Sequence, residues 1–291
     1  MKLSRIVCAT DFSAASQAAL SQAAALAEWE RAELHVISVG LDTNSAYRGG
    51  PRGAGASDPA AQAIVQTAYE IRADLVVVGA TVPHAGIRGR GWLAESVAYE
   101  ADCPTLIVPS ELAPTPGHLP FKNILCPVNF SPGSVVALHS ALYLAQRAEG
   151  ALTLVHVLDG TEEEGAMQTR WNPPPDESMR GGHALSRMWS AIPDDALNWC
   201  KIDAHVTAGS PTVRIAATAA GVNADLIVMG VTARGLFGGS TAGSILRGVA
   251  ADSTCPILVP RGPTHAAAWD QGYLSETIWK QRRAAFHYQH G

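Results

Sequence analysis

The chain has 291 residues, of which 47% are hydrophobic and 16% are charged, and it carries a formal net charge of −5. This length predicts about two domains of roughly 100–150 residues each. The acidic balance argues against a general nucleic-acid binder, which normally presents a basic face. All apolar runs are shorter than the ~20 residues that a membrane-spanning helix needs, and the N-terminus does not resemble a signal peptide. We therefore expect neither nucleic acid nor a membrane as a partner.

Cysteine usage predicts the cellular compartment. The chain has five cysteines, an odd number, without a Cys-x-x-Cys pair. This pattern indicates reduced thiols and a cytoplasmic protein. Cys8 and Cys126 lie in apolar segments and are interpreted as small buried hydrophobic residues rather than as reactive thiols.

The sequence repeats itself in two halves. Three segments of the first half recur in the same order in the second half. Ile-Val-Cys-Ala-Thr-Asp-Phe-Ser at 6–13 corresponds to Ile-Leu-Cys-Pro-Val-Asn-Phe-Ser at 124–131. Asp-Leu-Val-Val-Val-Gly at 74–79 corresponds to Asp-Leu-Ile-Val-Met-Gly at 225–230, and Cys-Pro-Thr-Leu-Ile-Val-Pro at 103–109 corresponds to Cys-Pro-Ile-Leu-Val-Pro at 255–260. A repeat this long indicates a duplicated domain rather than a solenoid unit. We predict a first half over residues 1–112, a second half over 121–261 and a tail over 262–291. A proline-rich linker at 113–120 joins the halves.

Each half alternates short β-branched runs with alanine-rich stretches, which is typical of βα units around a parallel sheet. In the first half we expect strands at 5–9, 33–39, 74–79 and 105–109, with helices at 13–30, 59–72 and 94–101. In the second half we expect a helix that starts at Ser131 and Pro132, further helices at 211–220 and 244–251, and strands at 151–158, 202–208, 225–230 and 257–260. The fold class is therefore α/β, with two doubly wound sheets in tandem.

The halves differ between their second strand and the following helix. The second half is longer between His156 and Pro211 than the first half is between His35 and Pro59. We infer that the first half lacks an edge strand and the helix before it. The tryptophan-containing insertion at 161–199 is expected to pack within the second half, and a surface for a partner is the alternative. Residues 275–288 could form an amphipathic helix on the bare sheet edge, and a disordered tail is the alternative.

Two strand ends are candidates for a ligand site, because doubly wound sheets bind ligands where the strand order switches. One lies at 10–11 and at 128–129, where the first strand of each half ends. The other is the glycine- and hydroxyl-rich stretch at 230–244, which leads into a helix and suits phosphate oxygens. Its spacing is not that of a Walker P-loop, because no Gly-Lys pair occurs in the chain. The Gly-x-Gly-x-x-Ala at 89–94 lies too far from its strand to be a dinucleotide fingerprint.

These motifs resemble those of a known family. The pattern combines an N-terminal Ile-Leu-x-Pro-x-Asp-Phe-Ser with a Gly-x2-Gly-x9-Gly-Ser/Thr motif that follows an Asp-Leu-Ile-Val-Met-Gly strand. It resembles that of the universal stress proteins. The resemblance covers 1–110 and 121–261, as in a tandem member. It implies a Rossmann-like parallel sheet with strand order 3-2-1-4-5 in each half. It also implies that ATP-binding members hold adenine at the first strand end and phosphates in the glycine loop.

Carried onto this chain, the resemblance favours the second half as the nucleotide site. Its candidate residues are Pro127, Val128, Asn129, Val157, Met229, Gly230, Ala233, Gly243, Ser244 and Ile245. Asn129 replaces the family's aspartate, and Ala233 replaces its second glycine. The first half offers weaker candidates, because its loop contains Pro83 and Trp92; they are Thr10, Asp11, Val36, Gly79 and Gly91.

The pattern shows no catalytic constellation: it lacks Gly-x-Ser-x-Gly, a zinc-ligand cluster and paired carboxylates at a strand end. We expect a cytoplasmic stress-response protein, not an enzyme beyond slow ATP hydrolysis, that binds ATP or AMP with or without Mg²⁺. The alternatives are a nucleotide-free scaffold and, third, a group-transfer enzyme.

Individual residues also have alternative interpretations. Asp11 and Asn129 could simply cap turns, and His35 and His156 are interpreted as hydrogen-bonded core histidines. The resemblance implies that the final strands at 105–109 and 257–260 pair as an internal pseudo-dimer. An unknown protein partner is expected, and a homodimer is left open.

Overall fold

The computed structural model describes residues 3–39, 58–80, 93–110, 120–158, 177–231 and 241–261. The first half contains β1 (Arg5–Thr10), α1 (Ala14–Glu30), β2 (Glu33–Ser38), α3 (Pro59–Glu70), β3 (Leu75–Ala80), α4 (Leu93–Glu100) and β4 (Thr105–Pro109). The second half contains β5 (Asn123–Pro127), α5 (Pro132–Ala148), β6 (Ala151–Leu158), α7 (Glu177–Ser190), the 3-10 turn η1 (Ala196–Asn198), β7 (Lys201–Ala208), α8 (Pro211–Gly221), β8 (Leu226–Val228), α9 (Thr241–Asp252) and β9 (Ile257–Val259).

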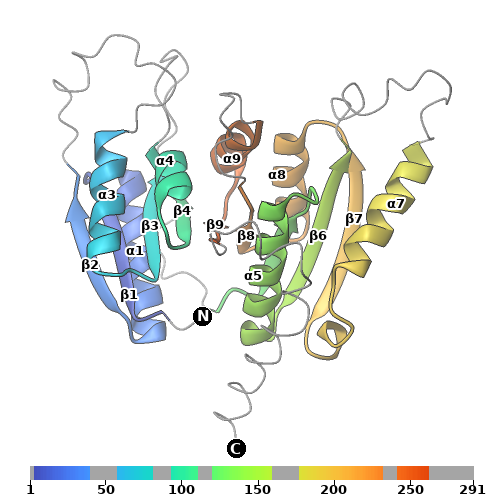
Figure 1. Cartoon of the computed structure of the whole chain (residues 1–291), viewed down its shortest axis with the longest axis horizontal. Helices are drawn as coiled ribbons and strands as arrows, with labels where there is room; N and C mark the ends of the chain where they lie inside the picture. The colour runs from blue at the N-terminus through green and yellow to red at the C-terminus, as the bar shows by residue number, and fades with distance from the viewer. Residues whose placement is uncertain are drawn as a thin grey trace, which may run out of the picture.

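The strands form one nine-stranded sheet of order β2-β1-β3-β4-β9-β8-β5-β6-β7 (Figure 1). In the second half this order is the predicted 3-2-1-4-5. The first half has four of these strands, and within the described residues no strand lies beyond β2, as the missing edge strand predicts. Neighbouring strands are parallel except β4 and β9, the final strands of the halves, which pair antiparallel.

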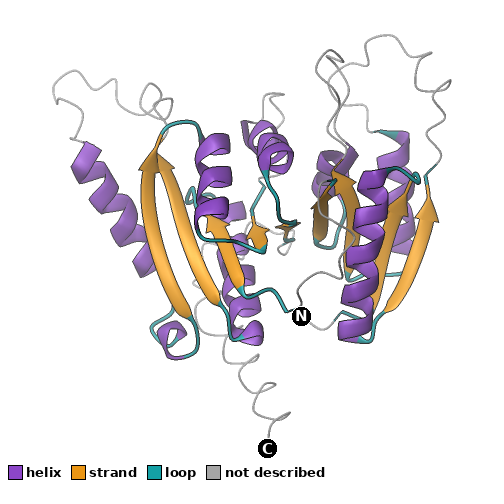
Figure 2. Cartoon of the chain, turned by 180° about the vertical axis from the view of Figure 1, so that it is seen from behind, coloured by secondary structure: helices purple, strands orange, loops and turns teal. Residues whose placement is uncertain are grey.

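Helices cover both faces of the sheet (Figure 2). Successive residues of β1 belong to opposite cores. Ile6 and Cys8 belong to the first core, which also contains side chains of α1, α5 and α7. Val7 and Ala9 belong to the second core, which also contains side chains of α3, α4, α8 and α9. Because both faces are covered, the strands are continuously apolar, as is usual for parallel sheets. Each core contains side chains from both halves.

The helices after the first strands begin in the same way in both halves. The Ser13 hydroxyl accepts from the Ser16 N–H, and the Ser131 hydroxyl accepts from the Ser134 N–H. These side chains satisfy donors that the first helical turn leaves unpaired. Pro132 occupies a first-turn position of α5, where its missing N–H costs nothing.

The described part of the insertion packs within the second half, as predicted. Helix α7 contacts β6 and β7, and its Met188 is fully buried. Ile192, Ala196 and Cys200 continue the same core toward β7. Residues 161–176, with Trp171, lie outside the described residues.

Two predictions require correction. Helix α9 begins at Thr241 and not at Ser244, so Gly243 and Ser244 lie inside its first turn. His35 is not a core histidine: its side chain is 30% exposed, and its Nε2 lies 3.3 Å from Glu33. The reason is that β2 is an edge strand, which lacks the cover that β7 gives to β6.

Other predictions stay untested. The linker at 113–119 and the tail at 262–291 lie outside the described residues. Within the described ranges, none of the helices is both long and apolar enough to cross a bilayer.

Candidate functional site

The candidate site lies where the strand order of the second half reverses. β5 pairs with β6 on one side and with β8 on the other, so the carboxyl ends of β5 and β8 are neighbours. The structure thus places Pro127, Val128 and Asn129 beside Met229 and Gly230. Helix α9, with Ile245 half-buried against the second core, follows β8 in the chain.

Val128 is held by hydrogen bonds inside the protein. Its N–H donates to the Val155 carbonyl at 2.8 Å, and its carbonyl lies 2.7 Å from Nδ1 of His156. A carbonyl oxygen can only accept, so Nδ1 carries the hydrogen in this pair. His156 is 5% exposed, which confirms the predicted hydrogen-bonded core histidine. Both backbone polar groups of Val128 therefore have a partner inside the protein.

Asn129 caps the turn into α5. Its Oδ1 accepts from the Ser131 N–H at 3.1 Å and from the Ser131 hydroxyl at 2.7 Å. The side chain is exposed, and its amide nitrogen has no hydrogen-bond partner among the described residues. The turn-capping interpretation is thus confirmed, and the amide nitrogen remains as a donor.

Asp11 makes the same turn in the first half. It accepts from the Ser13 N–H at 3.0 Å and from the Ser13 hydroxyl at 2.6 Å. Partial burial raises the pKa of Asp11, but hydrogen bonds, chiefly from Ser13, outweigh it and hold that pKa below its ordinary value of 3.8. Folding therefore favours the ionised carboxylate.

Gly230 and Gly79 let a helix approach the strand end closely. A Cβ on Gly230 would lie 2.0 Å from the Gly133 carbonyl oxygen in the first turn of α5. On Gly79 it would lie 2.6 Å from the Ala15 oxygen in the first turn of α1. These contacts are too short for a real Cβ, so both glycines have a packing role whether or not a ligand binds.

Among the described first-half candidates, Val36 is the one that is more exposed than its second-half equivalent. Thr10 is buried, and its hydroxyl donates to the Ser16 hydroxyl and accepts from the Phe12 N–H. Val36 is 48% exposed, whereas its equivalent Val157 is half-buried between strands. The difference follows from the edge position of β2.

Several predicted site residues are not placed by the structure. Ala233 and Gly91 lie outside the described residues, as does most of the glycine loop, 232–240. Gly243 and Ser244 are described only as part of the α9 backbone. In the ranges that are described, no three His, Cys, Asp or Glu side chains gather as a metal site requires.

A cluster next to the site was not predicted. The Phe130 ring lies 4.9 Å from the His156 ring, and the Arg187 guanidinium of α7 stacks over Phe130 at 3.9 Å. Phe130 has a positive φ of 59°. The repeat places Phe12 at the same position in the first half, but the sequence contains no signal that α7 covers one ring and leaves the other bare.

Comparisons with known proteins agree with this architecture. The model of the universal stress protein family matches residues 2–59, 54–109 and 120–261. A universal stress protein from Archaeoglobus fulgidus DSM 4304 is similar in structure, at 19% identity and a TM-score of 0.58, over 89% of this chain and 97% of that one. A putative universal stress protein from Pseudomonas aeruginosa UCBPP-PA14 matches at 18% identity and a TM-score of 0.55, over 89% and 93% of the two chains.

Those identities establish a shared fold only, and no curated protein matches the chain significantly. The family model, however, covers most of both halves, each of which contains the doubly wound unit around a switch point. The chain therefore belongs to the universal stress protein family, with two copies of the family unit in one polypeptide.

Proposed function

We propose that this protein binds an adenine nucleotide, ATP or AMP, mainly in its second half, and that it acts in a cytoplasmic stress response. Bound nucleotide would act by changing contacts with a protein partner rather than by undergoing a chemical reaction. The observation that carries this proposal is the adjacency of the β5 and β8 ends at the switch point, with a free amide donor on Asn129. Such crevices are where open α/β sheets bind ligands.

Asn129 would contribute to base recognition by donation. Its oxygen is committed to Ser131, so only the amide N–H₂ remains for a ligand. A ring nitrogen of adenine is an acceptor that such a donor can meet. The equivalent Asp11 is ionised and can only accept, so it offers the opposite polarity in the first half.

The phosphates would follow β8 toward the N-terminus of α9. Backbone N–H groups there have no intrahelical partner and carry the positive end of the helix dipole. Mg²⁺, if bound, would be held largely by the phosphates. The second-half candidates include no His, Cys, Asp or Glu that could act as a base or activate the Ser244 hydroxyl, so we expect hydrolysis to be slow.

The test is isothermal titration of the full chain with ATP-Mg²⁺ and with AMP, after assaying the purified protein for carried-over nucleotide. We expect a stoichiometry near one. Gly243→Val, which adds a branched side chain at the first turn of α9, should abolish binding without lowering the thermal midpoint. Asp11→Ala, in the first half, should leave the affinity nearly unchanged.

A second function is favoured by one observation. The polar groups of Val128 and the oxygen of Asn129 are all used within the protein. If neither binding nor carried-over nucleotide is found, the chain is better described as a scaffold that presents its surfaces to a protein partner. A large loss of affinity in Asp11→Ala would instead move the site to the first half.

A further inference from the structure

The seam between the halves has approximate two-fold symmetry. In the β4–β9 pair, Leu106 lies opposite Leu258, which occupies the same position of the repeat. Each is three residues after its shared cysteine, Cys103 or Cys255. A symmetry axis between these leucines brings equivalent positions of the two halves face to face. At such an axis, a pair of identical halves would place like residues against like.

On one face of the sheet, equivalent positions carry opposite charges. Glu95 of α4 and Arg247 of α9 each lie eight residues before the shared cysteine. They form an ion pair of 2.5 Å between Oε2 and Nη2, and the Glu95 side chain is only 11% exposed. Two identical halves would place two glutamates or two arginines here.

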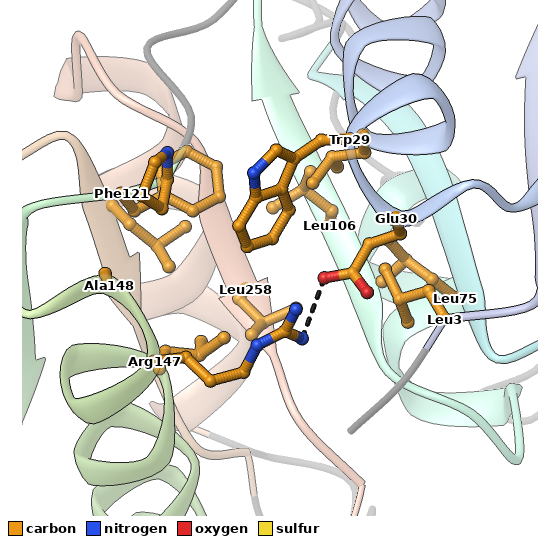
Figure 3. A pocket seen from close by; sticks show the side chains of 13 residues that line it. Leu3, Trp29, Glu30, Leu75, Leu106, Phe121, Arg147, Ala148 and Leu258 are labelled. Carbon is orange, nitrogen blue, oxygen red and sulfur yellow. Dashed lines mark ion pairs between the residues drawn. The ribbon is translucent and has the colours of Figure 1, made fainter. Parts of the chain in front are cut away.

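On the other face the halves differ in a second way. Trp29 and Arg147 both lie sixteen residues after their capping serines, Ser13 and Ser131. Arg147 pairs with Glu30 at 2.8 Å, and its guanidinium lies 4.9 Å from the Trp29 ring (Figure 3). The Glu30 side chain is 5% exposed, and Ala148 occupies its equivalent position. If a second copy of the first half took the place of the second half, tryptophan would replace Arg147, and neither glutamate would have an arginine partner there.

These contacts surround an apolar cavity of about 80 Å³ at the seam. Leu26 and its equivalent Leu144 line it, as do Leu3 and its equivalent Phe121. The Glu30 and Glu95 side chains are largely buried, and a buried charge needs a partner of opposite sign, because its desolvation is not otherwise offset. Placing like charges together at this seam would therefore destabilise the contact between the halves.

We propose that the seam is a heterotypic interaction surface, whose partner is the opposite half of this chain and never a like half of a second copy. The attractive elements are Glu30 with Arg147 and Glu95 with Arg247. When like halves meet, Glu95 faces a second glutamate or Arg247 faces a second arginine, and Glu30 and Arg147 lose their partners. Specificity achieved by both kinds of element is typical of interfaces that must reject a close relative. The inference does not depend on nucleotide binding.

The test uses full-length chains in which one side of the seam is reversed. One chain carries Glu30→Arg and Glu95→Arg, and the other carries Arg147→Glu and Arg247→Glu. Each chain alone has like charges at its own seam. Co-expressed, they can exchange halves, so that each first half meets a complementary second half. We expect native mass spectrometry to show a complex of one copy of each, whereas the wild-type chain shows the mass of one chain.

The matched control carries all four substitutions in one chain. It should return to the mass of one chain, with a thermal midpoint close to that of the wild type. Because Glu30 is deeply buried, a second set uses Glu95→Arg and Arg247→Glu alone. Each single variant should melt below the wild type, and the two combined in one chain should recover the midpoint.

Three results would overturn the proposal. The first is a wild-type chain that pairs through like halves. The second is that the Glu95→Arg chain and the Arg247→Glu chain each keep the mass and the thermal midpoint of the wild type. The third is a failure of the combined Glu95→Arg and Arg247→Glu chain to recover stability.

Discussion

At the end of the first strand of each half, one atom differs between two otherwise equal turns. Asp11 and Asn129 accept the same two hydrogen bonds from Ser13 and Ser131. The aspartate titrates and the asparagine does not. The two turns should therefore respond differently to acid, although their geometry is the same.

Asp11 should make the stability of the protein depend on pH at the acidic end. Its folded pKa is lowered below 3.8, so its stabilising contribution is present above 3.8 and is lost as the pH falls through the lowered value. Asp11→Asn should be less stable than the wild type at pH 7, and this deficit should shrink below pH 3.8. Urea unfolding of both proteins at several pH values measures this difference in the free energy of unfolding. Asn129→Asp is the reverse control and should add a dependence of the same sign.

Gly230 is predicted to be intolerant of any side chain. Gly230→Ala pushes a methyl group into the Gly133 backbone of α5, which cannot move without shifting the helix. We expect a loss of about 1–3 kcal/mol in the free energy of unfolding, the usual cost of overpacking. Gly182→Ala in α7 is the control, because nothing lies within 4 Å of the added Cβ. It should stabilise by roughly 0.5–1 kcal/mol. Equal effects from both substitutions would contradict the close approach.

At the scale of elements, α7 is the main difference between the halves. Phe130 packs against the first core under Arg187, whereas Phe12 is 73% exposed. Both have similar positive φ values, 59° and 63°, so any backbone strain is common to the two positions. A comparison of the two phenylalanines thus isolates the contribution of the α7 cover.

Phe130→Ala should therefore destabilise the protein much more than Phe12→Ala. Burial of a phenylalanine contributes about 1.5–3 kcal/mol, and the cation–π contact adds ~0.5–1 kcal/mol. We expect a loss of about 1–3 kcal/mol for Phe130→Ala and less than ~0.5 kcal/mol for Phe12→Ala. Urea denaturation of both variants tests this. A comparable loss at Phe12 would mean that another segment covers its ring.

At the scale of the whole molecule, the continuous sheet joins two domains into one cooperative body. Each core contains residues of both halves, and β4 and β9 hydrogen-bond across the seam. Unfolding of one half would expose apolar surface of the other. The two halves should therefore unfold together, unlike domains linked only by a tether.

Two equivalent cysteines report on this cooperativity. Burial raises the pKa of the Cys8 thiol to about 12 and raises the pKa of the Cys126 thiol as well. Both should resist iodoacetamide in the native protein, because the thiolate is the reactive form. Through a urea titration, alkylation of both should rise at one midpoint, as followed by mass spectrometry of the peptides. Separate midpoints would show that the halves unfold independently.

The sequence by itself determined the repeat, the α/β class and the difference in length between the halves. These features follow from local patterns: apolar runs bounded by Asp and Gly, capping serines, and the spacing between recurring segments. The strand order came instead from the resemblance to a known family. The repeat also predicted that Gly79 and Gly230 are equivalent, but it assigned both to a nucleotide site and not to a close helix approach. A glycine is compatible both with a phosphate loop and with a tight packing contact, so its role could not be chosen from the pattern.

Only the tertiary structure decided which groups meet across long separations in the chain. It placed the Arg187 guanidinium over Phe130, gave both polar groups of Val128 an internal partner, and left His35 on an edge strand. It also brought Glu95 to Arg247 and Glu30 to Arg147 at the seam. In the sequence these charges belong to ordinary helix surfaces. Their significance comes from the symmetry of the β4–β9 pair, because an axis makes two distant positions of the chain neighbours and local patterning contains no information about that axis.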